Sequence, residues 1–230
     1  GRCDLFLDHI QRIICSQDEE VFQWVMAWLA HLVQKPSVKP GTAIVLRSIE
    51  GTGKGIFANA IRELCGVHGI QVAHPRQLTG HFNSHLANKL LICADEVTWG
   101  GYKKDDGVLK TIVTEPTQVI EHKGQDSMEV RSFCRVLISS NNEWVVPAGR
   151  SSRRFLVLDV SNARVGDQAY FKAILNQMQN GGHAALWHHL RGLDLGQLPN
   201  PTVIIPTKAL RDQKLESLDA PLWLYLPELR

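Results

Sequence analysis

A glycine-rich segment that carries a lysine lies between a short apolar run and a helix-like stretch. It consists of Glu50, Gly51, Thr52, Gly53, Lys54 and Gly55. The apolar run, residues 42–46, predicts a strand, so the order is strand, loop and helix, with the lysine on the first helical turn. Glycines let backbone N–H groups surround a polyphosphate, the helix N-terminus adds a partial positive charge, and the lysine reaches the outer phosphates. The segment therefore predicts a nucleotide-binding loop.

This loop departs from the usual phosphate-loop pattern at two positions. Ser48 stands where the first glycine is usual, and Gly55 stands where a serine or threonine hydroxyl usually binds Mg²⁺. Glycine loops also serve as ordinary turns. The intact core, residues 51–54, supports nucleotide binding, whereas the missing hydroxyl bears on hydrolysis.

Two adjacent carboxylates, Asp95 and Glu96, end a second apolar run that begins after Lys89. In α/β folds, ligands bind at the sheet edge where parallel strands end. In a nucleotide hydrolase, Asp95 would hold Mg²⁺, while Glu96 would orient and polarise the attacking water. A strand that merely ends in a solvated acidic loop is the alternative. The position of the pair, about forty residues after the phosphate loop, favours catalysis.

Two further runs end or begin with polar side chains. Residues 135–140 predict a buried strand that would place Asn141 beside the γ-phosphate, although asparagine after a strand is also a common turn former. Arg153 and Arg154 precede the apolar run 155–158. Arginine at that point would reach the site of a neighbouring subunit more easily than its own loop. A solvated basic pair is the alternative.

Composition sets limits on the class of protein. The chain has 230 residues, 44% hydrophobic content and a formal net charge of +2, which excludes a disordered chain and a strongly basic one. Five scattered cysteines without a Cys-x-x-Cys pair predict a reducing, cytoplasmic setting. The longest apolar stretch, 21–33, is too short to cross a bilayer, so no membrane partner is expected. The abrupt helix-like start predicts a fragment of a longer protein.

Hydrophobic periodicity divides the chain into three zones. Residues 1–37 predict an N-terminal helical segment of two helices, which we expect to serve as a collar for oligomerisation. Residues 38–165 alternate strands and helices, which predicts an α/β core with a central, mostly parallel sheet. Residues 166–230 return to helical spacing, with a break at 180–182. The glycine-rich stretch Gly100–Gly107, with Lys103 and Lys104, predicts a charged loop.

The order of these motifs resembles the superfamily 3 helicases of viruses, phages and plasmids. It is most similar to the helicase portion of phage and mobile-element primase-helicase, or primase-polymerase, proteins. Flanking segments strengthen the resemblance, which covers roughly residues 20–215 and is more specific than any single motif. Those segments are Trp28–Pro36, Leu78–Asn83 and Leu109–Pro116.

The resemblance implies an AAA+-like P-loop NTPase core that assembles with itself into a ring, usually a hexamer, with ATP and Mg²⁺ held between subunits. Carried onto this chain, the resemblance implies that Thr52 and Lys54 bind the phosphates. It also implies that Asp95 and Glu96 serve the magnesium ion and the attacking water. It makes Asn141 the sensor of the γ-phosphate. Arg154 matches the arginine finger supplied to a neighbour, with Arg153 as its substitute.

The resemblance also implies a DNA-gripping hairpin between the acidic strand and the asparagine strand. Residues 117–130 alternate and turn as a hairpin should. His122 and Lys123 would sit near its tip and face single-stranded DNA in the central channel.

The function expected from sequence is an ATP-dependent DNA helicase motor, an ATP hydrolase, with a primase or polymerase domain on the same full-length chain. The first alternative is a ring-forming nucleotide-binding module that loads or tethers a primase-polymerase without unwinding, and Gly55 favours it. A small-molecule kinase is the second alternative. The adjacent acids, the paired arginines and the lack of an obvious substrate lid weigh against a kinase. ATP hydrolysis measured with and without single-stranded DNA separates the three.

Overall fold

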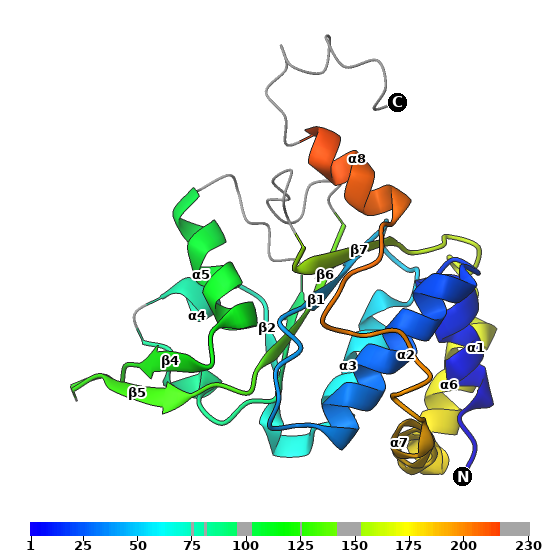
Figure 1. The fold of residues 1–230 in the computed structure, drawn as a ribbon. Helices are drawn as coiled ribbons and strands as arrows, with labels where there is room; N and C mark the ends of the chain where they lie inside the picture. Colours follow the sequence, from blue (N-terminus) through cyan, green and yellow to red (C-terminus); the bar gives the residue numbers. More distant parts are fainter. Residues whose placement is uncertain (75, 81, 96–102, 125, 142–152, 217–230) are drawn as a thin grey trace.

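A five-stranded sheet lies between two groups of helices (Figure 1). The structure is a computed structural model that describes residues 1–74, 76–80, 82–95, 103–124, 126–141 and 153–216. The strands are β1 (Ala43–Arg47), β2 (Gly69–Val72), β3 (Leu91–Asp95), β6 (Arg135–Ser140) and β7 (Phe155–Asp159). Their order is β2-β3-β6-β1-β7, and every neighbouring pair is parallel. The predicted α/β class with a mostly parallel central sheet is confirmed.

Successive strand residues point to opposite faces of this sheet, as the pleat requires. Along β1, Ile44 and Leu46 join one hydrophobic cluster, and Ala43 and Val45 join the other. All four side chains are fully buried. Because helices cover both faces, the central strands are uninterrupted apolar runs in the sequence.

Helices from both ends of the chain cover the first face. They are α1 (Asp4–His9), the π-helical turn η1 (Ile10–Ile14), α2 (Glu19–Gln34), α3 (Lys54–Leu64), α6 (Gln168–Gln177), a second π-helical turn η4 (Met178–Gly182) and α7 (His183–Gly192). One hydrophobic cluster joins them to the sheet. Figure 1 shows α1 and α6 side by side, so the N-terminal and C-terminal helical segments share a single core.

Local sequence signals explain where helix α2 begins and ends. The Asp18 carboxylate accepts a hydrogen bond from the Val21 N–H at 3.1 Å, which caps the first turn. The helix stops at Gln34, two residues before a proline that disfavours helical backbone ahead of it. Trp24 and Trp28 are fully buried, and each indole N–H donates to a backbone carbonyl. Both tryptophans are therefore packing residues.

A second set of helices covers the other face. They are α4 (Arg76–Thr79), the 3-10 turn η3 (Ser84–Leu86), α5 (Lys103–Thr114) and α8 (Lys208–Glu216). The predicted loop Gly100–Gly107 is wrong from Lys103 onward, where α5 begins. Leu109, Ile112 and Val113 are buried at helical spacing against this face, a stripe that the sequence contains and the interpretation overlooked.

Three smaller features complete the described chain. The 3-10 turn η2 (Gly66–His68) leads into β2, and β4 (Thr117–Ile120) pairs antiparallel with β5 (Met128–Arg131) as a separate hairpin.

The expected break in the C-terminal helices is confirmed at Gly181, whose φ is 91°. All five cysteines are free thiols. No helix in the described ranges is both long enough and apolar enough to span a bilayer.

A buried arginine ties the end of α2 to the sheet. Arg135, at the start of β6, is 1% exposed. Its guanidinium donates to the carbonyls of Lys35 at 2.8 Å and Val38 at 2.7 Å, and it contacts His31 Nδ1 at 3.1 Å. Burial lowers the pKa of Arg135 to about 10 and, with the nearby guanidinium, that of His31 to about 4. Carbonyls that follow the helix thus bind the terminal nitrogens of the guanidinium, whereas its buried Nε has no hydrogen-bond partner among the described residues.

Arg135→Met should destabilise the fold, because it keeps the apolar stem but leaves buried carbonyls without donors. We expect the free energy of unfolding, measured by urea titration, to fall by about 2–4 kcal/mol. Arg211→Met, at an exposed position of α8, is the matched control and should change it by less than about 0.5 kcal/mol. Equal effects of the two substitutions would show that the buried guanidinium contributes nothing specific.

Candidate nucleotide site

The glycine loop connects β1 to α3 and owes its shape to two left-handed glycines. Gly51 has φ 77°, and Gly53, directly before the helix, has φ 93°. A Cβ on Gly53 would also lie 2.6 Å from His9 Cε1 and 2.8 Å from Phe171 Cε1. Only glycine satisfies both the backbone angle and the close approach of those rings.

Lys54 is nearly buried, and its ammonium lies over the loop. Nζ is within hydrogen-bond distance of the Ser48 carbonyl (2.9 Å), the Ser48 hydroxyl (2.7 Å) and the Ile49 carbonyl (2.9 Å). Asn141 Oδ1 lies 3.0 Å away. The Ser48 hydroxyl is also 2.7 Å from the Thr52 hydroxyl. Ser48, which the sequence showed only as a departure from the pattern, therefore connects the lysine to the rest of the loop.

Asp95 and Asn141 reach the same place because β3 and β6 are neighbours. Asp95 pairs in register with Ser139 at the carboxyl end of β6, one step before the strand ends and Asn141 follows. The Asp95 carboxylate accepts a hydrogen bond from the Gln71 amide at 3.3 Å. The acidic strand and the asparagine strand are therefore direct neighbours. Glu96 lies outside the described residues.

These groups line one open cavity of about 470 Å³. Its walls include the six loop residues from Glu50 to Gly55, with Asp95 and Asn141. Ile56 also lines the cavity, as do Gly166, Gln168 and Phe171, which lie just before and at the start of α6 and which the sequence interpretation missed. Their helical spacing gives no sign that they reach a loop more than a hundred residues earlier. A glycine followed by a helix-capping aspartate at 166–167 was the available hint.

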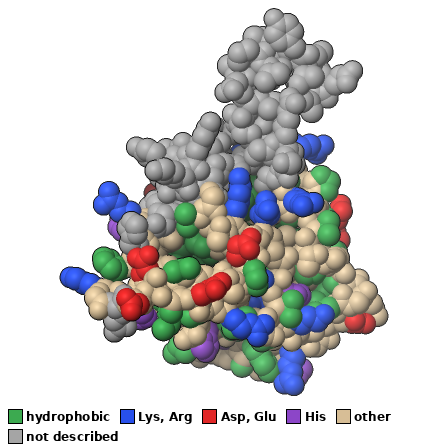
Figure 2. Space-filling model, turned by 60° about the vertical axis from the view of Figure 1, so that its left-hand side comes forward, with side chains coloured by type: hydrophobic (Ala, Val, Ile, Leu, Met, Phe, Trp, Pro, Cys, Tyr) green, Lys and Arg blue, Asp and Glu red, His purple; other side chains and the backbone are tan. Residues whose placement is uncertain are grey.

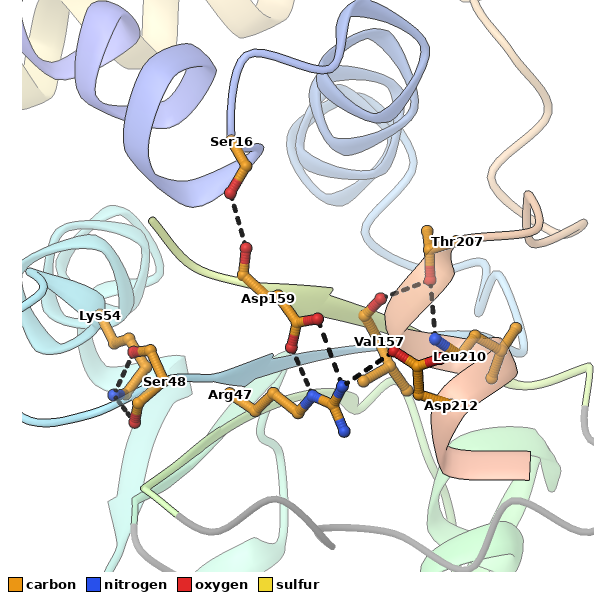
Figure 3. Close-up of polar contacts among 9 residues, drawn as sticks. All are labelled: Ser16, Arg47, Ser48, Lys54, Val157, Asp159, Thr207, Leu210 and Asp212. Atoms are coloured by element: carbon orange, nitrogen blue, oxygen red, sulfur yellow. Dashed lines mark hydrogen bonds and ion pairs between the residues drawn. The ribbon is translucent and has the colours of Figure 1, made fainter. Parts of the chain in front are cut away.

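A second cavity of about 700 Å³ adjoins the first, with Asn141 in both walls. Arg47, at the end of β1, forms an ion pair with Asp159 and lies 3.8 Å from the Asp212 carboxylate of α8 (Figure 3). The hydroxyl of Ser16 donates to the Asp159 carbonyl at 2.6 Å. In Figure 3, these contacts join the N-terminal helices, β1, β7 and α8 at the sheet edge that also carries Lys54.

Arg153 and Arg154 lie at the end of the sheet where β1 and β7 begin, opposite the end that carries the glycine loop. The Arg154 carbonyl accepts a hydrogen bond from the Ala43 N–H at 2.8 Å, before β1 and β7 begin their parallel course. The loop leaves the other end of β1, and a five-residue strand spans about 16 Å. Arg153 is exposed and Arg154 is half-buried. Neither arginine belongs to the cavity that contains Lys54.

The predicted hairpin is confirmed as β4 and β5, with residues 121–127 between them. Lys123 is exposed and His122 is half-buried, close to the tip. The Asn83 side chain donates to the Val119 carbonyl and accepts from the Glu121 N–H, each at 2.8 Å, which anchors one strand. Figure 1 shows the hairpin on the side of the sheet away from α1, α6 and α7.

Charge on the hairpin side is mixed. Figure 2 turns this side forward, and its described part shows basic, acidic and apolar side chains interspersed without a continuous basic surface. The low net charge of +2 agrees with this distribution. Any contact with nucleic acid would therefore be local. Within the described ranges, no group of three or more His, Cys, Asp or Glu side chains is arranged to hold a metal ion by itself.

Comparison with known proteins gives three kinds of similarity. Residues 46–154 match a family model described as a family of unknown function, DUF5906. The chain is 31% identical over 138 residues to the DNA primase-polymerase of Nitratiruptor phage NrS-1, covering 59% of this chain and 19% of that protein. This chain therefore aligns with about a fifth of that protein's length.

Two solved structures of the C-terminal region of the NrS-1 protein, both without ligand, share the fold. The first has a TM-score of 0.82 at 20% identity and covers 96% of this chain and 53% of the other. The second, an A form, has a TM-score of 0.82 at 21% identity, with 95% and 52% covered. The chain therefore spans about half of the solved region. At 20–21% identity, this likeness shows a shared fold and nothing further.

Proposed function

We propose that this chain is the ATP-hydrolysing motor of a DNA helicase, an AAA+-like domain of the superfamily 3 type within a larger phage replication protein. It acts as a homo-oligomeric ring, typically of six subunits, that translocates on single-stranded DNA in the cytoplasm of the host. A primase-polymerase domain on the same full-length chain supplies the template-copying activity. Similarity to a phage primase-polymerase supports the setting in replication.

The convergence of Lys54, Asp95 and Asn141 on the glycine-loop cavity is the single observation that supports this function most directly. The residues fit a nucleoside triphosphate. Left-handed Gly51 and Gly53 turn the backbone around the cavity, and the eleven-residue helix α3 directs its N-terminus there. The buried Lys54 ammonium would exchange loop carbonyls for phosphate oxygens.

A magnesium ion bound here would have one ligand among the described residues. Asp95 lines the cavity as a partly exposed carboxylate and would hold the ion directly or through water. Glu96, which follows it in the chain, would orient and polarise the attacking water. Asn141, already in contact with the lysine, would respond to the γ-phosphate. Mg²⁺ bound there would neutralise charge on the phosphates.

Arg154 would complete the site of a neighbouring subunit. Its position at the amino end of β7, across the sheet from its own loop, supports action in trans, with Arg153 as the substitute. An arginine finger supplied between subunits makes hydrolysis depend on the ring. The hairpin residues His122 and Lys123 would contact DNA phosphates in the central channel, from the side of the sheet away from α1 and α6.

A second candidate, the nucleotide-binding assembly module that does not unwind DNA, is favoured by Gly55. Position 55 is exposed, and a Cβ there would meet nothing within 4 Å. Packing therefore does not require the glycine, and the absence of a hydroxyl is a chemical difference. With one ligand fewer, a bound Mg²⁺ would depend on Asp95, Glu96 and water.

Lys54→Ala should abolish ATP hydrolysis and weaken ATP binding by about tenfold or more, because a charge-assisted contact to the phosphates is lost. Steady-state hydrolysis is measured with and without single-stranded DNA, and binding by calorimetry. Lys208→Ala, an exposed lysine on α8, is the control and should behave as the parent. Undiminished turnover in the Lys54 variant would exclude the loop as the catalytic site.

Arg154→Ala should be nearly inactive alone, with a loss of about 10³-fold or more, although its own loop is intact. Mixed with Lys54→Ala protein, it should regain part of the activity, because some interfaces then join a sound loop to a sound arginine. The matched control replaces the partner by the Lys54→Ala/Arg154→Ala double variant, which can form no such interface. Absence of rescue at every mixing ratio would contradict action in trans.

DNA-stimulated hydrolysis by the parent separates the two candidate functions, and Gly55→Ser tests the effect of the missing hydroxyl. A motor predicts that the parent already hydrolyses ATP faster with single-stranded DNA, and that the added hydroxyl changes the rate by no more than about tenfold. An assembly module predicts a parent that binds ATP without DNA-stimulated turnover. Gly55→Ala, which adds Cβ without the hydroxyl, controls for the change in helix propensity.

A further inference from the structure

The carbonyl of Gly53 has a second partner besides the helix that it starts. It accepts the first hydrogen bond of α3 from the Phe57 N–H at 3.1 Å. His9 Nε2, from α1, lies 3.3 Å from the same oxygen. His9 is fully buried, and 44 residues separate it from the loop. Because α3 retains its own bond, the histidine adds a constraint that the helix itself does not need.

The partners of the two ring nitrogens determine the tautomer of His9. His9 Nδ1 lies 3.1 Å from the Tyr170 hydroxyl of α6. A carbonyl only accepts, so Nε2 carries the proton and Nδ1 accepts from the tyrosine. Burial lowers the pKa of His9 to about 4 and raises that of the Tyr170 phenol, so both stay neutral near pH 7. Every polar atom of the imidazole therefore has a partner.

Aromatic packing also connects His9 and Tyr170 to the nucleotide cavity. The Phe171 ring stands edge-on to His9, with centroids 6.1 Å apart, and edge-on to Tyr170 at 5.3 Å. Phe171 also lines the cavity itself. The His9 and Phe171 rings both approach the Gly53 Cα so closely that no Cβ would fit there. Helices from opposite ends of the chain thus hold one peptide of the loop.

That peptide is the one whose orientation matters for phosphate binding. The Gly53 carbonyl and the Lys54 N–H belong to a single planar peptide group and point in opposite directions. Fixing the carbonyl toward His9 therefore turns the Lys54 N–H the other way, along with the other N–H groups of the first turn of α3, which have no acceptor within the helix.

We propose that His9, supported by Tyr170, is a positioning residue for the nucleotide: it holds the Gly53 peptide so that the N-terminus of α3 faces the phosphates. This inference rests on the proposed function. The histidine acts through the loop and does not touch the nucleotide. Since α1 and α6 meet through this contact, nucleotide binding and the packing of the two flanking helices are coupled.

His9→Phe tests the inference, because it keeps an aromatic ring but removes both hydrogen bonds. In the 230-residue chain, the Kd for ATP with Mg²⁺, measured by calorimetry, should rise about tenfold, the effect of one lost hydrogen bond. His9→Gln, whose amide N–H can still donate to the Gly53 carbonyl, should stay within about threefold of the parent. His188→Phe, at an exposed position of α7, is the control and should leave the Kd unchanged.

Tyr170→Phe provides an independent variant that removes only the hydroxyl. It should weaken ATP binding in the same direction, by about two- to fivefold, and it decides the matter if His9→Phe does not fold. The thermal unfolding midpoint without nucleotide separates positioning from structural damage. Rescue by His9→Gln with an unchanged midpoint is what a positioning role predicts.

The possible failures are distinguishable. If the parent and its folded variants bind ATP equally well, the positioning role of His9 is overturned while the nucleotide site stands. An equal Kd for Tyr170→Phe and the parent overturns it in the same way. If the parent itself binds no ATP, the proposed function fails, and the positioning role fails with it.

Discussion

The parallel pairing of β1 with β6, and of β6 with β3, is the constraint on which the rest of the structure depends. Parallel strands end at a common edge, so whatever follows β1, β3 and β6 is brought together there. The glycine loop follows β1, and Asn141 follows β6. Asp95 ends β3 in register with Ser139. The cavity that contains Lys54 is a direct result of strand order and direction.

The same polarity separates the arginines from that cavity. A residue that precedes a parallel strand lies at the amino edge, a strand's length from the phosphate loop. Arg154 stands there, and its backbone pairs with the residue that opens β1. A catalytic role for Arg154 is therefore compatible with this fold only through a second copy of the chain. Subunit assembly and hydrolysis are linked by that geometry in the function proposed here.

The flanking helices contribute more than cover for the sheet. Their apolar sides share one cluster with β1 and α3, which explains why both ends of the chain fold onto the same face. His9 and Phe171 extend that packing to the backbone of the loop itself. At the adjoining cavity, the ion pairs of Arg47 with Asp159 and Asp212 join α8 to the ends of β1 and β7. The glycine loop is thus supported by segments from both ends of the chain.

The sequence by itself determined the local features whose physical cause is local. The glycine loop, the cap of α2 at Asp18 and the glycine break at 181 follow from backbone preferences of single residues. The buried runs that become β1, β3 and β6 are visible because helices cover both faces of the sheet. The stripe that makes α5 a helix was equally local, but the glycines ahead of it suggested a loop.

Tertiary structure alone decided which distant side chains meet. Nothing in the spacing of Tyr170 and Phe171 shows that they contact His9, since helical periodicity marks a buried face without naming its partner. The same holds for Arg135, a cation buried at the start of a strand, whose acceptors are carbonyls after α2. In the sequence, Ser48 is only a departure from the motif, whereas in the structure its hydroxyl contacts both Lys54 and Thr52. Such contacts depend on how the layers pack, because their partners are chosen by proximity in space and leave no periodic signal along the chain.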